Sequence, residues 1–335
     1  MATPRVSILL PARDAEATLV ACLRSICRQS AADFECVVVD DGSTDRTVER
    51  ARDLARHDSR ICVLEGPRRG LVAALQQGLT ACNAQLVARM DADDVMHRDR
   101  LALQLQAMAD DPGLAGVGCH ARAFPTRSFG DGTRNYMEWL RSIRSEDDVM
   151  RERFVESPLL HPTWMLRKST AIAHGYRDEP WAEDYDLLLR MLGAGERLSV
   201  IPRTLHGWRR SQSCATATDP RYSEDRRADL KALRLCDGPL AARPDYVLWG
   251  HGATGRRLRR ALAARNRFPV AIVELDPRKI GQRHHGADVV APQAVMGYRD
   301  LPILICVANL APRAEARRRA TSLGLIELRD YWCCA

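Results

Sequence analysis

The sequence predicts an α/β protein whose main sheet is mostly parallel and covered by helices on both faces. Two observations lead to this prediction. Short apolar runs alternate with helical patterns over about the first hundred residues. A second, shorter series of the same kind begins near Asp245, where an apolar run leads into a glycine turn. Strands that alternate with helices are typical of parallel sheets, because a crossover between parallel strands is usually a helix.

The first series is regular. Strands are expected at 6–10, 35–41, 61–66 and 85–90, and helices at 14–30, 45–58, 70–83 and 97–108. In the first helix, Leu19, Leu23 and Ile26 recur at helical spacing. The pattern from Gly116 to Asp219 is less regular.

The second series predicts strands at 245–249, 269–276 and 301–309, with helices at 256–266 and 311–324. Gly-Pro and Arg-Pro pairs before Asp245 indicate a boundary. We therefore expect a first domain at 1–230, a linker at 231–244 and a second domain at 245–335.

Composition argues for an ordinary globular protein. The chain has 335 residues, of which 46% are hydrophobic and 28% charged. No apolar run approaches the roughly 20 residues of a membrane span, and the first residues lack a signal-peptide pattern. Eleven cysteines without any C-x-x-C pair fit neither a disulfide framework nor a zinc site. A cytoplasmic location is expected.

The positive charge is almost entirely arginine. The net charge is 50 − 43 = +7, and the lysines are Lys168, Lys231 and Lys279. Arginines cluster at 256–260 and 317–319. Such clusters are more often solvated helix faces than binding sites, but they also suit phosphates of a nucleic acid.

Acidic residues follow two of the predicted strands. Asp91, Asp93 and Asp94 end the strand at 85–90, and Asp41 ends an earlier one. Asp94 could cap the next helix, or the cluster could be a solvated turn. However, ligands of parallel sheets bind beyond the carboxyl ends of strands, which favours one shared site.

Six segments carry a resemblance to a known family. They are VSILLPARDAEATL, VVVDDGSTD, RRGLVAALQQGL, MDADD, HPTWMLRKS and EDYDLLLR, in this order. Together they resemble the family 2 glycosyltransferases of the GT-A fold over about the first 215 residues. The resemblance implies transfer of a sugar from a nucleotide-diphosphate donor, with a UDP-sugar expected.

The resemblance assigns the acid cluster to donor and metal. Asp91 and Asp93 match the family's D-x-D pair, which implies that Asp91 contacts the donor and Asp93 binds a divalent cation, Mn²⁺ or Mg²⁺. Hard cations prefer carboxylate oxygens, and a cation neutralises a diphosphate.

Further donor contacts are implied at other strand ends. Asp41 matches the contact to the base, and Pro11 and Arg13 flank the nucleotide pocket. Arg69 and Gly70 match a loop near the phosphates, although Arg69 could be only a surface residue.

The segment EDYD supplies the expected catalytic base. Inverting transfer requires a base that takes the proton of the acceptor hydroxyl, and Asp184 matches that base. A first-turn acid would also stabilise the helix that follows. Glu183, His161 and Trp164 are implied on the acceptor side, and Arg209 could face the diphosphate.

The second domain contains a G-x-G-x-x-G pattern at Gly250, Gly252 and Gly255, with Glu274 near the end of the next strand. This context suits a second nucleotide site. Only about 90 residues remain, so a structural or regulatory remnant is an equal alternative.

The pairing of both domains resembles the queuosine-tRNA galactosyltransferase group and its bacterial relatives, which makes tRNA a candidate acceptor. The expected function is an inverting, metal-dependent glycosyltransferase. The alternatives are an enzyme of surface-glycan or lipid-linked sugar synthesis and a non-catalytic protein that senses nucleotides.

Overall fold

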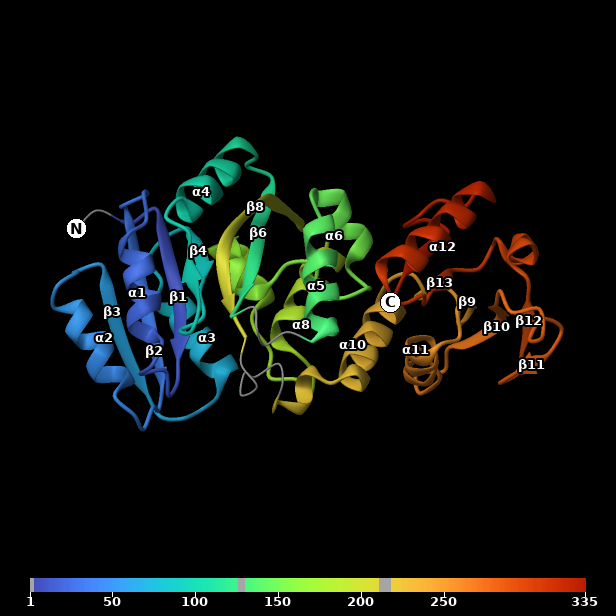
Figure 1. The fold of residues 1–335 in the computed structure, drawn as a ribbon, viewed down its shortest axis with the longest axis horizontal. Helices are drawn as coiled ribbons and strands as arrows, with labels where there is room; N and C mark the ends of the chain where they lie inside the picture. The colour runs from blue at the N-terminus through green and yellow to red at the C-terminus, as the bar shows by residue number, and fades with distance from the viewer. Residues whose placement is uncertain (1–2, 126–129, 211–217) are drawn as a thin grey trace. The chain divides into compact units, whose positions relative to one another are not determined.

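The chain forms two compact units, each with its own sheet (Figure 1). The computed structural model describes residues 3–125, 130–210 and 218–335. The first unit comprises Met1–Val149, Leu159–Glu179 and Glu183–Cys214, and the second comprises Met150–Pro158, Pro180–Ala182 and Ala215–Ala335.

The first unit contains an eight-stranded sheet in the order β3-β2-β1-β4-β7-β6-β8-β5. Its strands are β1 (Val6–Ala12), β2 (Phe34–Asp41), β3 (Ile61–Gly66), β4 (Leu86–Arg89), β5 (Val95–Met96), β6 (Leu114–Phe124), β7 (Met165–Arg167) and β8 (Arg197–Arg209). The first four strands are parallel, and β6 is parallel to β8, whereas β7 and β5 run antiparallel to their neighbours.

Helices cover both faces of this sheet, as the apolar pattern predicts. Successive side chains of a strand point to opposite faces. In β1, Ile8 and Leu10 belong to the buried cluster that includes α1 (Leu19–Cys27), whereas Leu9 lies against Gly78 of α3 (Leu71–Ala81). All seven positions of β1 are buried, so this strand is covered on both sides.

The other helices of the first unit are α2 (Thr47–Ala55), α4 (Arg100–Asp110), α5 (Asp131–Ser142), α7 (Lys168–His174), α8 (Glu183–Gly193) and the 3₁₀ turn η2 (His161–Thr163). Helix α6 (Glu146–Glu152) spans the boundary with the second unit.

The second unit contains a six-stranded sheet in the order β11-β12-β10-β9-β13-β14, parallel except at β11. Its strands are β9 (Asp245–Trp249), β10 (Phe268–Val273), β11 (Arg283–His284), β12 (Ala287–Val290), β13 (Ile303–Ile305) and β14 (Tyr331–Cys333). The helical segments are η3 (Pro220–Tyr222), α10 (Glu224–Asp237), α11 (Ala253–Ala263), η4 (Pro292–Tyr298) and α12 (Leu310–Ser322).

The structure differs from the expectations at three places. The region after Gly116 is more regular than expected, because it contains the long strands β6 and β8. The expected linker at 231–244 begins inside α10. The unit that holds the second sheet also includes 150–158 and 180–182, so it is not one continuous segment.

Among the described residues, no helix combines the length and the apolar character that a membrane crossing requires.

Candidate functional site

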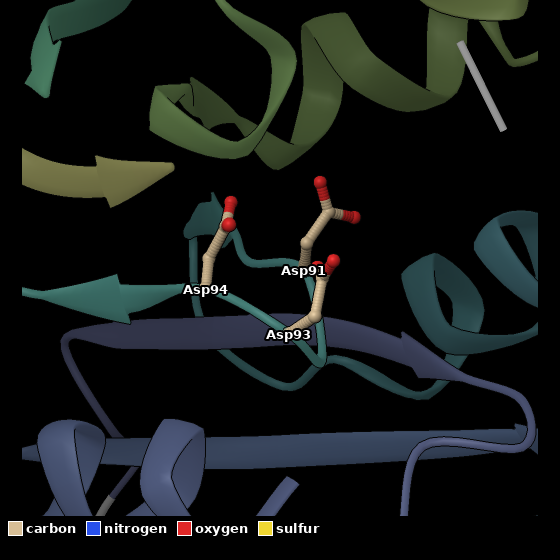
Figure 2. A group of neighbouring side chains, drawn as sticks. All are labelled: Asp91, Asp93 and Asp94. Carbon is tan, nitrogen blue, oxygen red and sulfur yellow. The ribbon is translucent and has the colours of Figure 1, made fainter. Parts of the chain in front are cut away.

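Three carboxylates cluster on the loop between β4 and β5. Asp91, Asp93 and Asp94 each have a carboxylate oxygen within 4.8 Å of the others. Figure 2 shows that all three side chains project to the same side of this loop. The loop lies at the carboxyl end of β4, where the sequence predicts the site.

Asp91 is held by a buried arginine that the sequence analysis missed. Arg89 Nη2 donates a hydrogen bond to Asp91 Oδ1 at 2.6 Å, and the Arg89 side chain is only 5% exposed. Its Nε and Nη1 are buried without a hydrogen-bond partner in the described part of the chain. The sequence did contain a sign of this contact. Arg89 ends an otherwise apolar strand, and a buried charge is almost always paired.

Asp94 has a structural role. Its Oδ2 accepts a hydrogen bond from His206 Nε2 (2.7 Å) and its Oδ1 accepts one from the backbone N–H of Arg209 (2.6 Å). Arg100 Nη1 lies 3.1 Å from His206 Nδ1, and arginine can only donate, so His206 carries its proton on Nε2. The proposal that Asp94 caps a helix is wrong: α4 has Asp99 at its N-cap, and Asp94 instead joins the loop to β8.

Asp93 is the carboxylate best suited to a cation. Burial, together with the nearby charges of Asp91 and Asp94, raises its pKa to about 7. Carboxylates that repel one another in this way are stabilised when a cation joins them. The cluster therefore fits a divalent cation. Both oxygens of Asp94 already accept hydrogen bonds, so Asp93 and Asp91 are the carboxylates available to the cation.

Arg209 lies beside this cluster. Its Nε donates to the backbone oxygen of Asp93 (2.7 Å), and its guanidinium lies over the ring of Phe124 at 4.5 Å. This places a fixed positive charge at the acid loop, although contact with a diphosphate stays a prediction. The segment that follows Arg210 lies outside the described residues.

A second group of predicted residues meets at the ends of β1 and β2. Asp41 Oδ1 accepts hydrogen bonds from the backbone N–H groups of Arg69 (2.7 Å) and Gly70 (2.9 Å). Arg13 Nη1 lies 3.6 Å from Asp41 Oδ2, and Pro11 is buried near the end of β1. Gly70 has a φ of 93°, which favours glycine. Asp41 therefore fixes the start of α3, and its contact with a base stays a prediction.

This group borders a pocket of about 410 Å³, which is lined in part by Asp40, Asp41, Glu65, Pro67 and Arg69. The volume lies within the usual range of small-molecule sites.

Asp184 lies in the first turn of α8, where its Oδ1 accepts a hydrogen bond from the N–H of Tyr185 (2.7 Å). The phenol of Tyr176 lies within the electrostatic influence of both this turn and the acid loop. Burial raises the pKa of Tyr176, and the charges of Arg89, Glu183, Asp184 and Asp91 all act on it. The charges of the predicted base and of Asp91 thus both act on this buried phenol.

His161 and Glu183 lie beneath the surface of this region. His161 Nε2 lies 2.8 Å from the Tyr176 hydroxyl, and its Nδ1 lies 3.9 Å from Glu183 Oε1. Burial, with the nearby charge of Arg89, lowers the pKa of His161, so the ring is neutral near pH 7. Glu183 is 1% exposed. Both residues can orient the turn, and direct contact with an acceptor stays a prediction.

Trp164 is buried beside His161. The ring is 2% exposed, packs edge-on against His161 and donates from Nε1 to the backbone oxygen of Leu159. The ring is part of the core, and a role on the acceptor side stays a prediction.

The glycine turn of the second unit has the local geometry expected of its pattern. Gly250 has a φ of 96°, and a Cβ at Gly255 would lie 2.2 Å from the Gly250 oxygen. Nothing lies within 4 Å of a Cβ at Gly252. The N–H of His251 lies 3.3 Å from Glu274 Oε1. A second nucleotide site here stays a prediction.

Comparison with known proteins identifies the first unit. Residues 7–175 match the family described as glycosyl transferase family 2. The chain belongs to glycosyl transferase family 2. The resemblance seen in its motifs is confirmed at the level of the family.

Bacterial proteins are similar to this chain in sequence. The chain is 34% identical over 116 residues to the uncharacterized glycosyltransferase EpsJ of Bacillus subtilis, covering 35% of this chain and 33% of EpsJ. It is 26% identical over 210 residues to the chondroitin synthase of Pasteurella multocida, covering 61% of this chain and 21% of that enzyme. The chain thus spans about a third or less of the length of these relatives.

Solved structures of other proteins share the fold. TarS of S. aureus in complex with UDP-GlcNAc has a TM-score of 0.55 at 16% identity, covering 77% of this chain and 71% of that one. The mannosyltransferase PcManGT of Pyrobaculum calidifontis, in complex with GDP-Man and Mn²⁺, also has a TM-score of 0.55, at 21% identity, covering 79% and 70%. The expected GT-A fold is confirmed.

Proposed function

We propose that this family 2 glycosyltransferase is an inverting, metal-dependent enzyme that uses a nucleotide-diphosphate sugar, with a UDP-sugar as the first candidate. The observation that carries the proposal is the acid loop: Asp91 is held by Arg89, Asp94 is bonded to β8, and the Asp93 carboxylate lies between like charges. Such an arrangement supports binding of a cation together with a diphosphate.

In this proposal a divalent cation held by Asp93, with Asp91, neutralises the diphosphate and stabilises the departing nucleotide. Asp41 and the Arg69–Gly70 loop border the pocket that takes the nucleotide. Arg209 supplies positive charge beside the acid loop. PcManGT, which was solved with Mn²⁺, supports the choice of cation.

Asp184 is the proposed base. Its hydrogen bond from Tyr185 orients the carboxylate, and the first turn of α8 favours its ionised form. Asp184 accepts the proton of the acceptor hydroxyl as that oxygen attacks the sugar from the face opposite the leaving group.

We propose a glycan hydroxyl as the acceptor rather than a tRNA nucleoside. Chondroitin synthase is named for making a polysaccharide, which supports this choice. Several arginines that could meet RNA are also paired within the second unit: Arg317 with Glu152 and Glu327, and Arg318 and Arg319 with Glu315. A reducing, cytoplasmic location is proposed because the ten cysteines of the described residues are free.

The test is the substitution Asp184→Asn, assayed with a panel of UDP- and GDP-sugars and Mn²⁺. Donor binding by calorimetry is expected to stay within about twofold, whereas turnover falls about a hundredfold or more, the scale of losing a general base. Slow donor hydrolysis gives a readout without a known acceptor.

The control is Asp178→Asn, because Asp178 is exposed. Asp186 is unsuitable as a control because it is buried against Arg190. Turnover by Asp184→Asn close to the wild-type rate would reject Asp184 as the base. Saturable tRNA binding, together with glycosylation of tRNA in preference to oligosaccharides, would reject the glycan acceptor.

A further inference from the structure

Arg89 occupies one oxygen of the first acid of the D-x-D pair. It is the last residue of β4, and its Nη2 donates to Asp91 Oδ1 at 2.6 Å. The Arg89 side chain is buried, whereas that of Asp91 is 33% exposed. Burial opposes the charge of the guanidinium, but Asp91, Tyr176 and Glu183 raise its pKa, so it stays ionised. Asp91 is therefore a carboxylate whose charge is already compensated by the protein.

The backbone of Arg89 is fixed as well as its side chain. Its N–H donates to the backbone oxygen of Trp164 (2.8 Å), and its own backbone oxygen accepts a hydrogen bond from Arg100 Nη2 (2.9 Å). The strand that ends at Arg89 is paired on both sides, with β1 and with β7. The guanidinium thus has a defined position at the start of the acid loop.

Folding stability alone does not account for this arginine. Its Nε and Nη1 are buried without a hydrogen-bond partner among the residues that the structure describes. A buried donor without an acceptor costs stability, and a buried ion pair stabilises a fold little more than apolar side chains of similar size. Buried polar groups that stay unsatisfied call for another explanation, and a role at a functional site is one.

The two acids of the pair differ in how their charges are compensated. Burial and the charges of Asp91 and Asp94 raise the pKa of Asp93 to about 7, and the charge of Arg209 offsets this only in part. A guanidinium and a metal cation repel each other and compete for the same carboxylate. The cation is therefore favoured at Asp93, while Asp91 keeps one oxygen that can accept a hydrogen bond from a neutral hydroxyl.

We propose that Arg89 is a positioning residue that assigns the two acids to different ligands. It reserves Asp91 for a hydroxyl of the nucleotide or sugar of the donor, and it leaves the divalent cation mainly to Asp93. Without this arginine, Asp91 would be free to join Asp93 as a second ligand of the cation. The inference rests on the proposed function, because it requires a cation and a nucleotide at the acid loop.

The test is calorimetric titration of the full chain with Mn²⁺ alone, and then with UDP or GDP at saturating Mn²⁺. Arg89→Met should bind Mn²⁺ about threefold more tightly or better, since a positive charge is removed and Asp91 is released. The same variant should bind the nucleotide about tenfold more weakly, since Asp91 no longer has a fixed orientation toward a hydroxyl. The double variant Arg89→Met/Asp91→Asn should lose the gain in Mn²⁺ affinity.

Arg60→Met is the matched control. Arg60 also pairs with an aspartate two positions away, since its Nη2 donates to Asp58 Oδ2 at 2.6 Å. It directly precedes β3, so it lies at the amino end of the parallel strands, opposite the end that carries the acid loop. Both affinities should stay at the wild-type values in this control. Arg89→Lys keeps a charge beside Asp91 and should keep the Mn²⁺ affinity within about twofold.

Two single variants keep the proposal testable if Arg89→Met does not fold, which thermal unfolding without metal shows. Asp93→Asn should lose Mn²⁺ binding, whereas Asp91→Asn should keep it within about threefold and lose affinity for the nucleotide. Equal loss of Mn²⁺ binding in these two variants would overturn the proposal. So would an Arg89→Met variant whose two affinities are unchanged or are both weakened, as a purely structural role predicts. Absence of Mn²⁺ binding by wild type would instead reject the metal-dependent function itself.

Discussion

Asp93 and Asp94 are neighbours in the chain, yet their environments differ in kind. Both oxygens of Asp94 accept protein hydrogen bonds, from His206 and from the N–H of Arg209. Asp93 lies partly buried near two other carboxylates, and its pKa is raised to about 7. Burial and the charge of Asp91 raise the pKa of Asp94 as well. The two residues therefore differ in their hydrogen bonds and not in the direction of their pKa shifts, and a carboxylate with both oxygens bonded is typical of structure.

Asp93→Asn is therefore expected to stabilise the cation-free protein while removing its response to Mn²⁺. An acid whose folded pKa lies above its unfolded value of about 3.9 binds more protons when folded, so wild type loses stability as pH rises from about 4 to 7. The gain of Asp93→Asn should be on the order of 1 kcal/mol at pH 8 after solvent screening, and should vanish near pH 4.

Thermal unfolding at both pH values, with chelator and then with Mn²⁺, measures these effects. Asp99→Asn is the control, because Asp99 is a half-exposed acid on the same segment. If Mn²⁺ stabilises Asp93→Asn as much as wild type, Asp93 is not the ligand.

At the scale of elements, one buried series of hydrogen bonds joins the acid loop to β8 and α4. His206 of β8 contacts Asp94 through one ring nitrogen and Arg100 of α4 through the other. Arg100 is fully buried and also donates to the backbone oxygen of Arg89 (2.9 Å). These hydrogen bonds fix the acid loop relative to β8 and α4.

His206→Phe should destabilise the protein by about 3–5 kcal/mol, since it leaves a carboxylate and a guanidinium buried without their shared partner. Denaturant unfolding measures the loss. His97→Phe, at an exposed position, is expected to change stability by no more than about 0.5 kcal/mol. Equal stability of the two variants would show that the buried chain contributes nothing.

At the scale of the whole molecule, the second unit depends on a segment from the middle of the chain. Glu152 is 7% exposed and pairs with Arg317 (2.7 Å), and it lies 3.8 Å from Arg313. Both arginines belong to α12, more than 150 residues later in the chain. The segment 150–158 is thus part of the core of this unit, and a fragment that begins after it would lack these partners.

Glu152→Ala should destabilise the second unit by about 3–5 kcal/mol, because two buried guanidinium groups lose an acidic partner. Glu315→Ala removes a half-exposed acid that pairs with Arg318 and Arg319, and should cost about 1 kcal/mol or less. Hydrogen exchange of the amides of α12 measures the difference. Similar protection in both variants would contradict a role for Glu152 in joining the segment to α12.

The regular elements of the first hundred residues could be predicted because their information is local. Apolar periodicity sets the strands and helices from Val6 to Asp110, and the motifs identify the family. Strands β6 and β8 were missed for a physical reason. Gly116, Gly118 and Pro202 disfavour a strand locally, and it is pairing between these two strands, with register shifts, that stabilises them.

The sequence by itself determined the α/β class, the family and the acids at the carboxyl ends of the strands. The types of the side chains and their positions along the chain suffice for these three features. Only the tertiary structure decided which of those acids have protein hydrogen-bond partners. Asp94 accepts a hydrogen bond from His206 across 112 positions of the chain, Arg89 donates to Asp91 at a buried strand end, and Lys231 donates to the backbone oxygen of Val155 across 76 positions. The protonation and the partners of these groups depend on burial and on neighbours in space, and the pattern of adjacent residues in the sequence gives neither burial nor such neighbours.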